Sequence, residues 1–373
     1  MTLYIGLMSG TSLDGIDGVL LDFGSLRGPP LTLRAHHHQP FDAVLRAELA
    51  ALNIPGANEL QRSELAANAL ARNCAAVVHA LLTTSATTAQ QVRAIGAHGQ
   101  TVRHRPGEFD GLGYTTQLLN GALLAELTGI DVVCDLRRRD VAAGGQGAPL
   151  APGLHAALFT VAGEARAVLN LGGIANLTLL SCDGTVLGFD CGPANALLDG
   201  WCQRHTGRAY DAGGHWSRDG QADEFLLAGL LAEPYFAMQP PKSTGRDLFN
   251  MAWLDAHVAR HAPGAAAVDV QATLLALTVR SVAQALRRHA ADTSLLMVCG
   301  GGAFNAALMQ GLVAALPTLR VTTTAEFGLP VDQVEAAAFA WLGQCFVERV
   351  AGNIVAVTGA RAPRVLGALH TAR

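Results

Sequence analysis

Residues able to bind phosphate and to move protons recur in this chain, each group at the end of an apolar run. The first is Gly10–Asp17, with the sequence GTSLDGID, which lies between the apolar runs Leu3–Met8 and Val19–Leu21. Glycines in such a turn leave backbone N–H groups free to face an anion, and Asp14 and Asp17 stand where a metal-bound phosphate needs carboxylates. The segment therefore predicts a hairpin that binds a nucleotide.

Three later segments repeat this order of apolar strand, glycines and polar residues. Any one of them alone is as well explained by an ordinary turn, because glycine commonly follows a strand. Their recurrence favours contacts to the phosphates and the nucleoside of one ligand. The segments are Val168–Thr178, Val186–Asn195 and Leu295–Asn305.

The glycines and polar residues of these turns are the predicted nucleotide contacts. Asp14 and Asp17 are also predicted to contact Mg²⁺ through water, since magnesium keeps several of its waters, with turn formation as the alternative for Asp14. The predicted contacts are Gly10, Thr11, Ser12, Leu13, Asp14, Gly15, Ile16, Asp17, Asn170, Gly172, Gly173, Asn176, Gly300, Gly301, Gly302 and Asn305.

Composition limits the class of protein. With 373 residues, half of them hydrophobic, the chain is long enough for two domains with a ligand cleft between them. A net charge of -4 without a basic stripe argues against nucleic acid, and we expect neither a membrane segment nor a signal peptide. The seven cysteines are odd in number and lack a Cys-x-x-Cys pair, which favours a reducing, cytoplasmic location.

Hydrophobic periodicity predicts strands alternating with helices in both halves of the chain. The pattern of the first three strands begins again at residue 166, which indicates a weak internal duplication of one α/β unit, with the boundary near 150–165. The glycine-rich loop 142–150 is either a ligand-approach loop or a connector. Expected strands are 3–8, 16–23, 31–38, 92–97, 130–134, 166–171, 176–181, 185–189, 294–299 and 319–323; expected helices are 41–51, 59–83, 119–128, 194–205, 251–259, 268–290, 303–315 and 332–349.

Two carboxylates are candidates for acid and base chemistry. Asp190 follows a strand and precedes Gly192, so it either faces a ligand or caps the next helix. Glu335 begins the last long helix, where a catalytic role and a favourable interaction with the helix dipole are both consistent with its position.

Polar residues near two other strand ends are candidates for substrate binding. His98, Gln100 and Thr101 follow strand 92–97, where α/β folds place ligand residues, although capping of the next segment is the alternative. Arg137 is suited to a bidentate contact with a carboxylate of a ligand, or else to a salt bridge within the protein.

Several common motifs are excluded. Lys242-Ser-Thr follows Pro240-Pro241 and not a glycine-rich loop, so a P-loop is not supported, and neither a dinucleotide-binding glycine motif after a strand nor His-Glu-x-x-His occurs. The run His36–His38 is interpreted as a solvated strand edge and not as a metal site.

The four glycine-bearing segments resemble the phosphate, connecting and adenosine motifs of the sugar kinase, heat-shock chaperone and actin superfamily. Within it, the chain resembles the family of anhydro-N-acetylmuramic acid kinases from Gly6 to about Leu369. The strings that carry this closer resemblance are Met8–Asp17, Ala97–Pro106, Asp135–Arg137, Ala143–Pro149, Asn170–Asn176, Lys242–Arg246 and Gly328–Glu335.

The resemblance implies a duplicated ribonuclease-H-like (actin-like ATPase) fold with an interdomain cleft. One domain would span 1–160 plus about 340–373, and the other, with the adenosine site, would span 161–339. The implied enzyme uses ATP and Mg²⁺ to open and phosphorylate a small anhydro amino sugar, with Asp190 as base and Glu335 as a second carboxylate. It also implies a homodimer.

Two alternatives remain at this stage. A kinase for a different sugar would have the same cleft but an ordinary hydroxyl attack on the phosphate. A nucleotide-gated binding module of the same fold would bind ATP without turnover stimulated by sugar.

Overall fold

We describe the protein from its computed structural model, which covers residues 2–24, 31–245 and 247–372. Arg246, the last residue of one string that carries the family resemblance, lies outside these described residues. The chain folds into two compact units. Unit 1 comprises Met1–Phe159 and Gln333–Arg373, and unit 2 comprises Thr160–Asp332.

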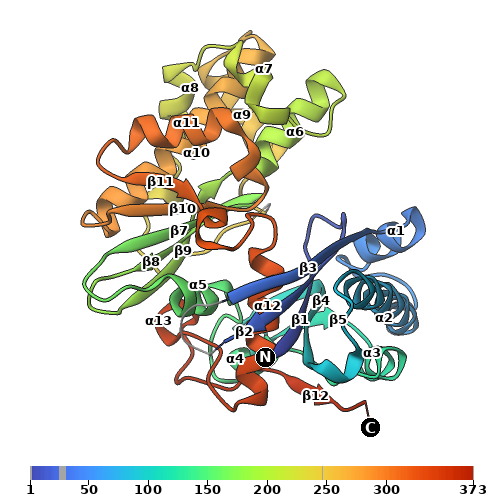
Figure 1. Cartoon of the computed structure of the whole chain (residues 1–373). Helices are drawn as coiled ribbons and strands as arrows, with labels where there is room; N and C mark the ends of the chain where they lie inside the picture. The colour runs from blue at the N-terminus through green and yellow to red at the C-terminus, as the bar shows by residue number, and fades with distance from the viewer. Residues whose placement is uncertain (1, 25–30, 246, 373) are drawn as a thin grey trace. The chain divides into compact units, whose positions relative to one another are not determined.

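Unit 1 is built on a mixed sheet in the order β12-β6-β4-β1-β2-β3, with β5 paired to β4 (Figure 1). β1, β2 and β3 form an antiparallel meander, while β4 runs parallel to β1, and β6 runs parallel to β4. The strands are β1 (Leu3–Ser9), β2 (Gly15–Phe23), β3 (Leu31–Pro40), β4 (Val92–Pro106), β5 (Gly113–Leu118), β6 (Val132–Cys134) and β12 (Ala368–His370).

Unit 2 contains a second sheet in the order β11-β10-β7-β8-β9. β7, β8 and β9 form an antiparallel meander, while β10 runs parallel to β7, and β11 runs parallel to β10. The strands are β7 (Arg166–Leu171), β8 (Ile174–Leu180), β9 (Val186–Pro193), β10 (Leu295–Cys299) and β11 (Arg320–Thr323).

The two sheets share one topology. β1, β2, β3, β4 and β6 of unit 1 correspond in order and direction to β7, β8, β9, β10 and β11 of unit 2. This is a meander of three antiparallel strands followed by two parallel strands on the other side of the first strand. The predicted fold class, a duplicated α/β ribonuclease-H-like fold, is confirmed.

Helices of unit 1 pack on the apolar faces of its strands. α2 packs on β2 and β3, and α12 packs on β1 and β4. α2 is long and apolar enough to cross a membrane by length and composition, and half of its most apolar stretch is buried within the protein. The helices are α1 (Ala43–Ala51), α2 (Glu59–Thr84), α3 (Gly121–Thr128), α4 (Arg138–Ala142), α5 (Ala151–Phe159), α12 (Val334–Val347) and α13 (Val355–Thr358).

The long helix α10 (Ala267–His289) organises unit 2. It packs on β9 and contacts each of the shorter helices α6, α7, α8 and α11. Short polar side chains begin several of these helices, for example Asn305, whose Oδ1 accepts a hydrogen bond from the Leu308 N–H at 3.1 Å. The other helices are α6 (Asn195–Thr206), α7 (His215–Arg218), α8 (Glu224–Leu231), α9 (Met251–His261) and α11 (Ala306–Ala315).

One strand differs from its prediction in a way that matters for the site. The sequence predicted a strand that ends at residue 97, but β4 continues to Pro106 and pairs antiparallel with β5. The polar residues after Ala97 are accommodated because β5 supplies backbone partners beyond the end of β1. His98, Gln100 and Thr101 therefore lie within β4, beside the point where β1 ends at Ser9.

Candidate active site

The turn between β1 and β2 is organised by Asp14. Its Oδ1 accepts hydrogen bonds from the Ser12 hydroxyl at 2.8 Å and from the Gly15 N–H at 3.0 Å. Thr11, Ser12 and Asp14 are exposed, whereas the Ile16 side chain is buried in the core of unit 1. The side chains of Thr11, Ser12 and Asp14 are therefore accessible to a ligand, whereas Ile16 could contact a ligand only through its backbone.

Asp17 is held from the neighbouring strand. It pairs in register with His38 on β3, and its Oδ1 lies 2.9 Å from His38 Nδ1 and 3.5 Å from His36 Nε2. Burial raises the pKa of Asp17, but hydrogen bonds from both imidazoles outweigh this effect and lower the pKa overall. The sequence interpretation of His36–His38 missed this contact, which alternation on an antiparallel pair could have suggested.

His98 and Arg137 form a buried chain of hydrogen bonds. Arg137 Nε donates to His98 Nε2 at 2.9 Å, so His98 carries its proton on Nδ1 and donates it to the Ser9 carbonyl at 3.1 Å. Burial, assisted by the charge of Arg137, lowers the pKa of His98 to about 3. His98 is therefore a neutral imidazole that orients Arg137.

The Arg137 guanidinium has a second anchor, because its Nη1 donates to the Gly147 carbonyl at 2.8 Å. Gly147 belongs to the glycine-rich loop, and its own N–H donates to Asp140 Oδ2 at 2.8 Å. Burial lowers the pKa of Arg137 to about 10, against the opposing charges of Glu335 and Asp140. The loop is thus part of the support for Arg137.

Gln100 and Thr101 lie next to the first turn. Gln100 accepts a hydrogen bond from the Ser9 hydroxyl and donates to the Gly10 carbonyl at 3.2 Å. The Thr101 hydroxyl accepts from Gln117 Nε2 at 3.1 Å. The structure therefore brings His98, Gln100 and the predicted phosphate turn together at one end of the sheet of unit 1.

Glu335 lies in the first turn of α12, and its side chain is exposed. Although solvent reaches the side chain, the protein around the carboxyl group raises its pKa, and the negative charges of Asp17 and Asp14 raise it further, while Arg137 opposes them. These are residues that the sequence predicted for the nucleotide, the metal and the sugar. Glu335 thus shares the electrostatic environment of the unit 1 candidates.

In unit 2, the turn between β7 and β8 is joined to the start of α6. The carbonyls of Gly172 and Gly173 accept hydrogen bonds from the N–H groups of Asn195 and Ala194 at 3.1 and 3.0 Å. Asn170 and Asn176 face each other in register across the hairpin. This turn matches the β1–β2 turn of unit 1 in topology.

The loop after β10 packs against the same turn. Gly300 has φ +80, and a Cβ there would lie 2.3 Å from Asn170 Oδ1; one at Gly302 would lie 2.5 Å from the Leu171 Cβ. Only glycine allows this approach of the two backbones. Gly301 is exposed, while Asn305 caps α11 with its side chain.

Asp190 lies within β9, which continues to Pro193 and does not end at residue 189 as the sequence predicted, and it has three hydrogen-bonding neighbours outside the sheet. Its Oδ2 accepts from the Thr244 N–H at 2.9 Å, its N–H donates to the Lys242 carbonyl at 3.1 Å, and its carbonyl accepts from the Tyr235 hydroxyl at 2.9 Å. Burial raises the pKa of Asp190 to about 6, against the Thr244 hydrogen bond and the Lys242 charge. A carboxylate with this pKa is suited to accept a proton near neutral pH.

The sequence did not predict the roles of Tyr235 and Thr244. Lys242-Ser-Thr was used to exclude a P-loop and as part of a string that carries the resemblance, and Tyr235 was not singled out. The contact could not be inferred from local sequence, because 54 residues separate Thr244 from Asp190. The only sequence feature that pointed to Thr244 was the family string that contains it. These residues fix the backbone and the carboxylate of Asp190.

The donor set fits a magnesium ion held largely by phosphate and water. Asp14 and Asp17 offer carboxylates at the end of the sheet of unit 1, and each already uses Oδ1 within the protein. Across the described residues, no group of three His, Cys, Asp or Glu side chains is arranged to enclose a metal. Mg²⁺ typically binds kinase sites through one or two carboxylates and the substrate phosphates.

Comparison with known proteins gives a consistent result. The family model "Anhydro-N-acetylmuramic acid kinase" matches residues 2–372. A protein of that name from Variovorax paradoxus (strain S110) is 59% identical over 375 residues, covering 99% of both chains. Another from Cupriavidus pinatubonensis is 56% identical over 369 residues, covering 98% of both.

Solved structures are more distant. The activator of the 2-hydroxyisocaproyl-CoA dehydratase from Clostridium difficile, with bound ADPNP, is 14% identical, with a TM-score of 0.47 over 95% of this chain and 99% of that one. A ROK family glucokinase from Streptomyces griseus, in complex with glucose and AMPPNP, is 16% identical, with a TM-score of 0.39 over 91% of this chain and 99% of that one.

Proposed function

Because this chain belongs to the family of anhydro-N-acetylmuramic acid kinases, we propose that Asp190 is the general base of its reaction. The chain is an ATP-dependent sugar kinase of peptidoglycan recycling. It opens the 1,6-anhydro ring of 1,6-anhydro-N-acetylmuramic acid and phosphorylates O6, giving N-acetylmuramic acid 6-phosphate and ADP.

The chemistry requires one base and one phosphoryl donor. The oxygen of a water molecule bonds to C1 of the sugar while the bond from C1 to O6 breaks. O6 then bonds to the γ-phosphorus of ATP, and the bond from that phosphorus to the bridging oxygen breaks to release ADP. Asp190 takes the proton from the attacking water and later returns it to solvent.

The observation that supports this assignment is the setting of the Asp190 carboxylate. Its Oδ2 is fixed by the Thr244 N–H at 2.9 Å, and burial raises its pKa to about 6. The carboxylate is therefore both oriented and basic enough to accept a proton at neutral pH. Glu335 is the second carboxylate, which we assign to orienting the sugar or sharing the proton.

For the sugar, Arg137 is the proposed partner of the lactyl carboxylate. Its Nε and Nη1 are already held by His98 and Gly147, so the remaining nitrogen, Nη2, is the one we assign to the substrate. His98 supports Arg137 through its Nε2. Gln100 and Thr101, on the same strand, are assigned to the hydroxyl and acetamido groups.

For ATP, the glycine turns supply backbone donors. We assign Gly10–Asp17 and Asn170–Asn176 to the phosphates, and Gly300, Gly301, Gly302 and Asn305 to the adenosine. Asp14 and Asp17 would hold Mg²⁺ through water, and the ion would neutralise phosphate charge when bound. We further infer a cytoplasmic homodimer, for which light scattering gives a direct test of mass.

The test combines labelled water with a matched pair of variants. In H₂¹⁸O, the wild-type product should gain phosphate and one ¹⁸O at C1, as read by mass spectrometry. Asp190→Asn should lower kcat by about 10²- to 10⁴-fold, because it cannot accept the proton. Asp183→Asn, on the β8–β9 turn of the same hairpin, removes an exposed carboxylate and should leave kcat unchanged.

Different outcomes separate the proposals. Full activity in a folded Asp190→Asn variant would remove Asp190 from the mechanism. A phosphorylated product without ¹⁸O would indicate an ordinary hydroxyl acceptor instead of ring opening.

A further inference from the structure

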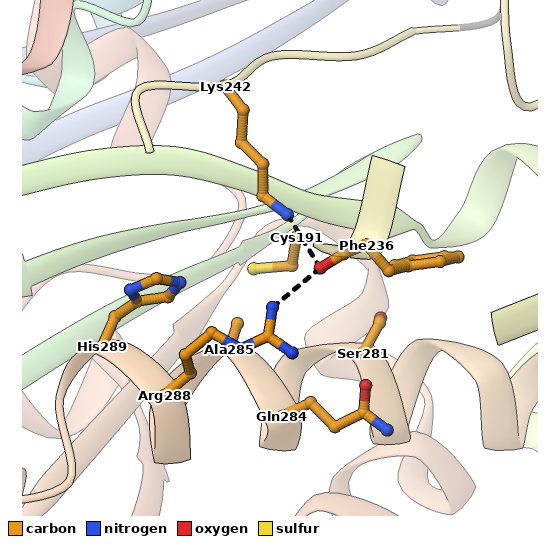
Figure 2. Close-up of a pocket in the computed structure, with 8 residues that line it drawn as sticks. All are labelled: Cys191, Phe236, Lys242, Ser281, Gln284, Ala285, Arg288 and His289. Carbon is orange, nitrogen blue, oxygen red and sulfur yellow. Dashed lines mark hydrogen bonds between the residues drawn. The ribbon is translucent and has the colours of Figure 1, made fainter. Parts of the chain in front are cut away.

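Unit 2 contains a pocket beside β9 and α10 (Figure 2). Cys191, which follows Asp190 on this strand, is one of the residues that line the pocket. The pocket is open to solvent and narrow, so an anion larger than a water molecule requires its lining side chains to move apart. The lining residues are Cys191, Phe236, Lys242, Ser281, Gln284, Ala285, Arg288 and His289.

The lining is basic and contains no carboxylate. Lys242 Nζ lies 3.5 Å from the Phe236 carbonyl oxygen, and Arg288 Nη1 donates to that same oxygen at 3.1 Å (Figure 2). The two cations thus share one neutral acceptor, and the further partners of Lys242, the carbonyl and the ring of Tyr235, are neutral as well. A carbonyl dipole compensates two full charges poorly, so the pocket is left with an excess of positive potential.

A third basic group experiences this potential. Burial lowers the pKa of His289, and the positive charges of Arg288 and Lys242 lower it further. The negative charge of Asp190 also acts on Lys242, but Asp190 does not line the pocket.

The donors lie at two depths. Lys242 is only 9% exposed and lies deep in the pocket, where its ammonium also contacts the Tyr235 carbonyl at 3.1 Å. Arg288 and Gln284 are exposed on α10, one turn apart, at the opening. An anion entering from solvent would therefore meet a guanidinium and an amide first and an ammonium last.

We propose that this pocket binds a phosphate group, either free phosphate or the phosphate of a phosphorylated sugar. A guanidinium and an ammonium facing a carboxylate-free cavity match a tetrahedral oxyanion with two negative charges. The bound group would replace the shared Phe236 carbonyl as the principal partner of both cations. The pocket also adjoins the catalytic strand, since the Lys242 carbonyl accepts the Asp190 N–H.

Direct binding tests the site in the full chain. The nucleotide site is first saturated with a non-hydrolysable ATP analogue and Mg²⁺, and binding of ³²P-orthophosphate is then measured by equilibrium dialysis. Arg288→Gln should weaken binding by about tenfold or more, since a charge-assisted contact is lost. Arg287→Gln is the matched control, because Arg287 is the exposed neighbour on α10 that donates to the Ala315 carbonyl instead.

A second variant addresses the deep cation. Lys242→Met should abolish the saturable binding while circular dichroism shows a folded protein. Equal affinity in wild type and a folded Arg288→Gln or Lys242→Met variant would overturn the proposal, as would absence of saturable binding in wild type.

Competition then identifies the source of the phosphate. Displacement of the label by N-acetylmuramic acid 6-phosphate, dependent on Arg288, would indicate that a sugar phosphate occupies the pocket. Displacement by unlabelled orthophosphate alone would indicate free phosphate, and both results support the site. If chloride at equal ionic strength displaces the label as well as phosphate does, the pocket has no preference for phosphate and the proposal fails.

Discussion

The pKa of Asp190 is set by opposing effects on its carboxyl group. Burial favours the neutral acid, whereas the Thr244 N–H and the Lys242 charge favour the anion, and the balance raises its pKa to about 6. A general base must be deprotonated to act, so kcat/KM should fall as the pH drops below about 6. The Thr244 hydrogen bond keeps the pKa from rising further.

Thr244→Pro removes this N–H without removing any charge. The pKa of Asp190 should then rise, and the fall of kcat/KM at acid pH should move to higher pH by about one to two units, since a hydrogen bond to a charged group contributes roughly 1.5–3 kcal/mol. Thr244→Ala retains the N–H, so its kcat/KM should fall at the same pH as that of the wild type. The measurement is kcat/KM between pH 5 and 8. If kcat/KM falls at the same pH in both variants, the Thr244 N–H does not set the pKa of Asp190.

At the level of residues, the sequence named candidates whose roles stay predictions, and it did not predict the contacts that hold them. Asp190, Arg137 and His98 were all selected from strand ends and residue chemistry. Their partners were not predicted, because 39 residues separate His98 from Arg137 and 54 separate Asp190 from Thr244. Contacts over such separations depend on the path of intervening loops, for which local periodicity carries no information.

The position of Glu335 depends on how closely one helix approaches a sheet. α12 lies so near β1 and β4 that a Cβ at Gly6 would be 1.9 Å from the Ala336 carbonyl oxygen. A Cβ at Gly96 would be 1.9 Å from the Phe339 carbonyl oxygen. Glycines on two neighbouring strands therefore let α12 pack directly against the sheet. This packing fixes the position of the first turn of α12, which carries Glu335.

Gly96→Ala tests this packing. The added methyl group would force α12 away from β4, and we expect a loss of at least about 2 kcal/mol in the free energy of unfolding, because overpacking typically costs 1–3 kcal/mol and here the obstacle is backbone. Urea unfolding measures the change. Gly56→Ala is the control, since its Cβ would meet only the flexible end of Arg62 at 3.1 Å. Equal free energies of unfolding in the two variants would show that α12 can move away from β4 at little cost, and would contradict the prediction.

The predicted end of a strand was wrong where pairing with a neighbouring strand, and not the local sequence pattern, decides where the strand stops. The polar residues from His98 onward suggested that the strand stops at residue 97, yet β4 extends to Pro106 because β5 pairs with it. The helices α4 and α5 around the glycine-rich loop were also missed, since glycine and proline in and around them obscure helical periodicity. The meanders were predicted, because their strands alternate with short turns.

At the scale of the whole molecule, two sheets of one topology carry separate sets of candidates. Duplication could be predicted because the order of strand, glycine turn and strand occurs twice, even without residue identity. What the pattern could not show is that unit 1 buries two neutral histidines. His98 and His155 are 4% and 1% exposed, and burial lowers the pKa of each to about 3.

These histidines should make unit 1 sensitive to acid. Each has a lower pKa in the folded state than the ordinary value of 6.5, so the unfolded chain binds more protons between about pH 6.5 and 3. The stability they contribute is complete above pH 6.5 and is lost as the pH falls, by up to about 1.4 kcal/mol per pH unit for each histidine.

Hydrogen exchange read by mass spectrometry can measure this for β1 and β4 at pH 7 and pH 5, after correction for the intrinsic exchange rate. The free energy of opening in wild type should be lower at pH 5. His155→Gln cannot be protonated, so it should lose less of its stability between the two pH values, whereas His79→Gln, at an exposed position on α2, should follow wild type. If β1 and β4 of wild type open with the same free energy at both pH values, these histidines bind protons in the folded protein and their burial does not keep them neutral.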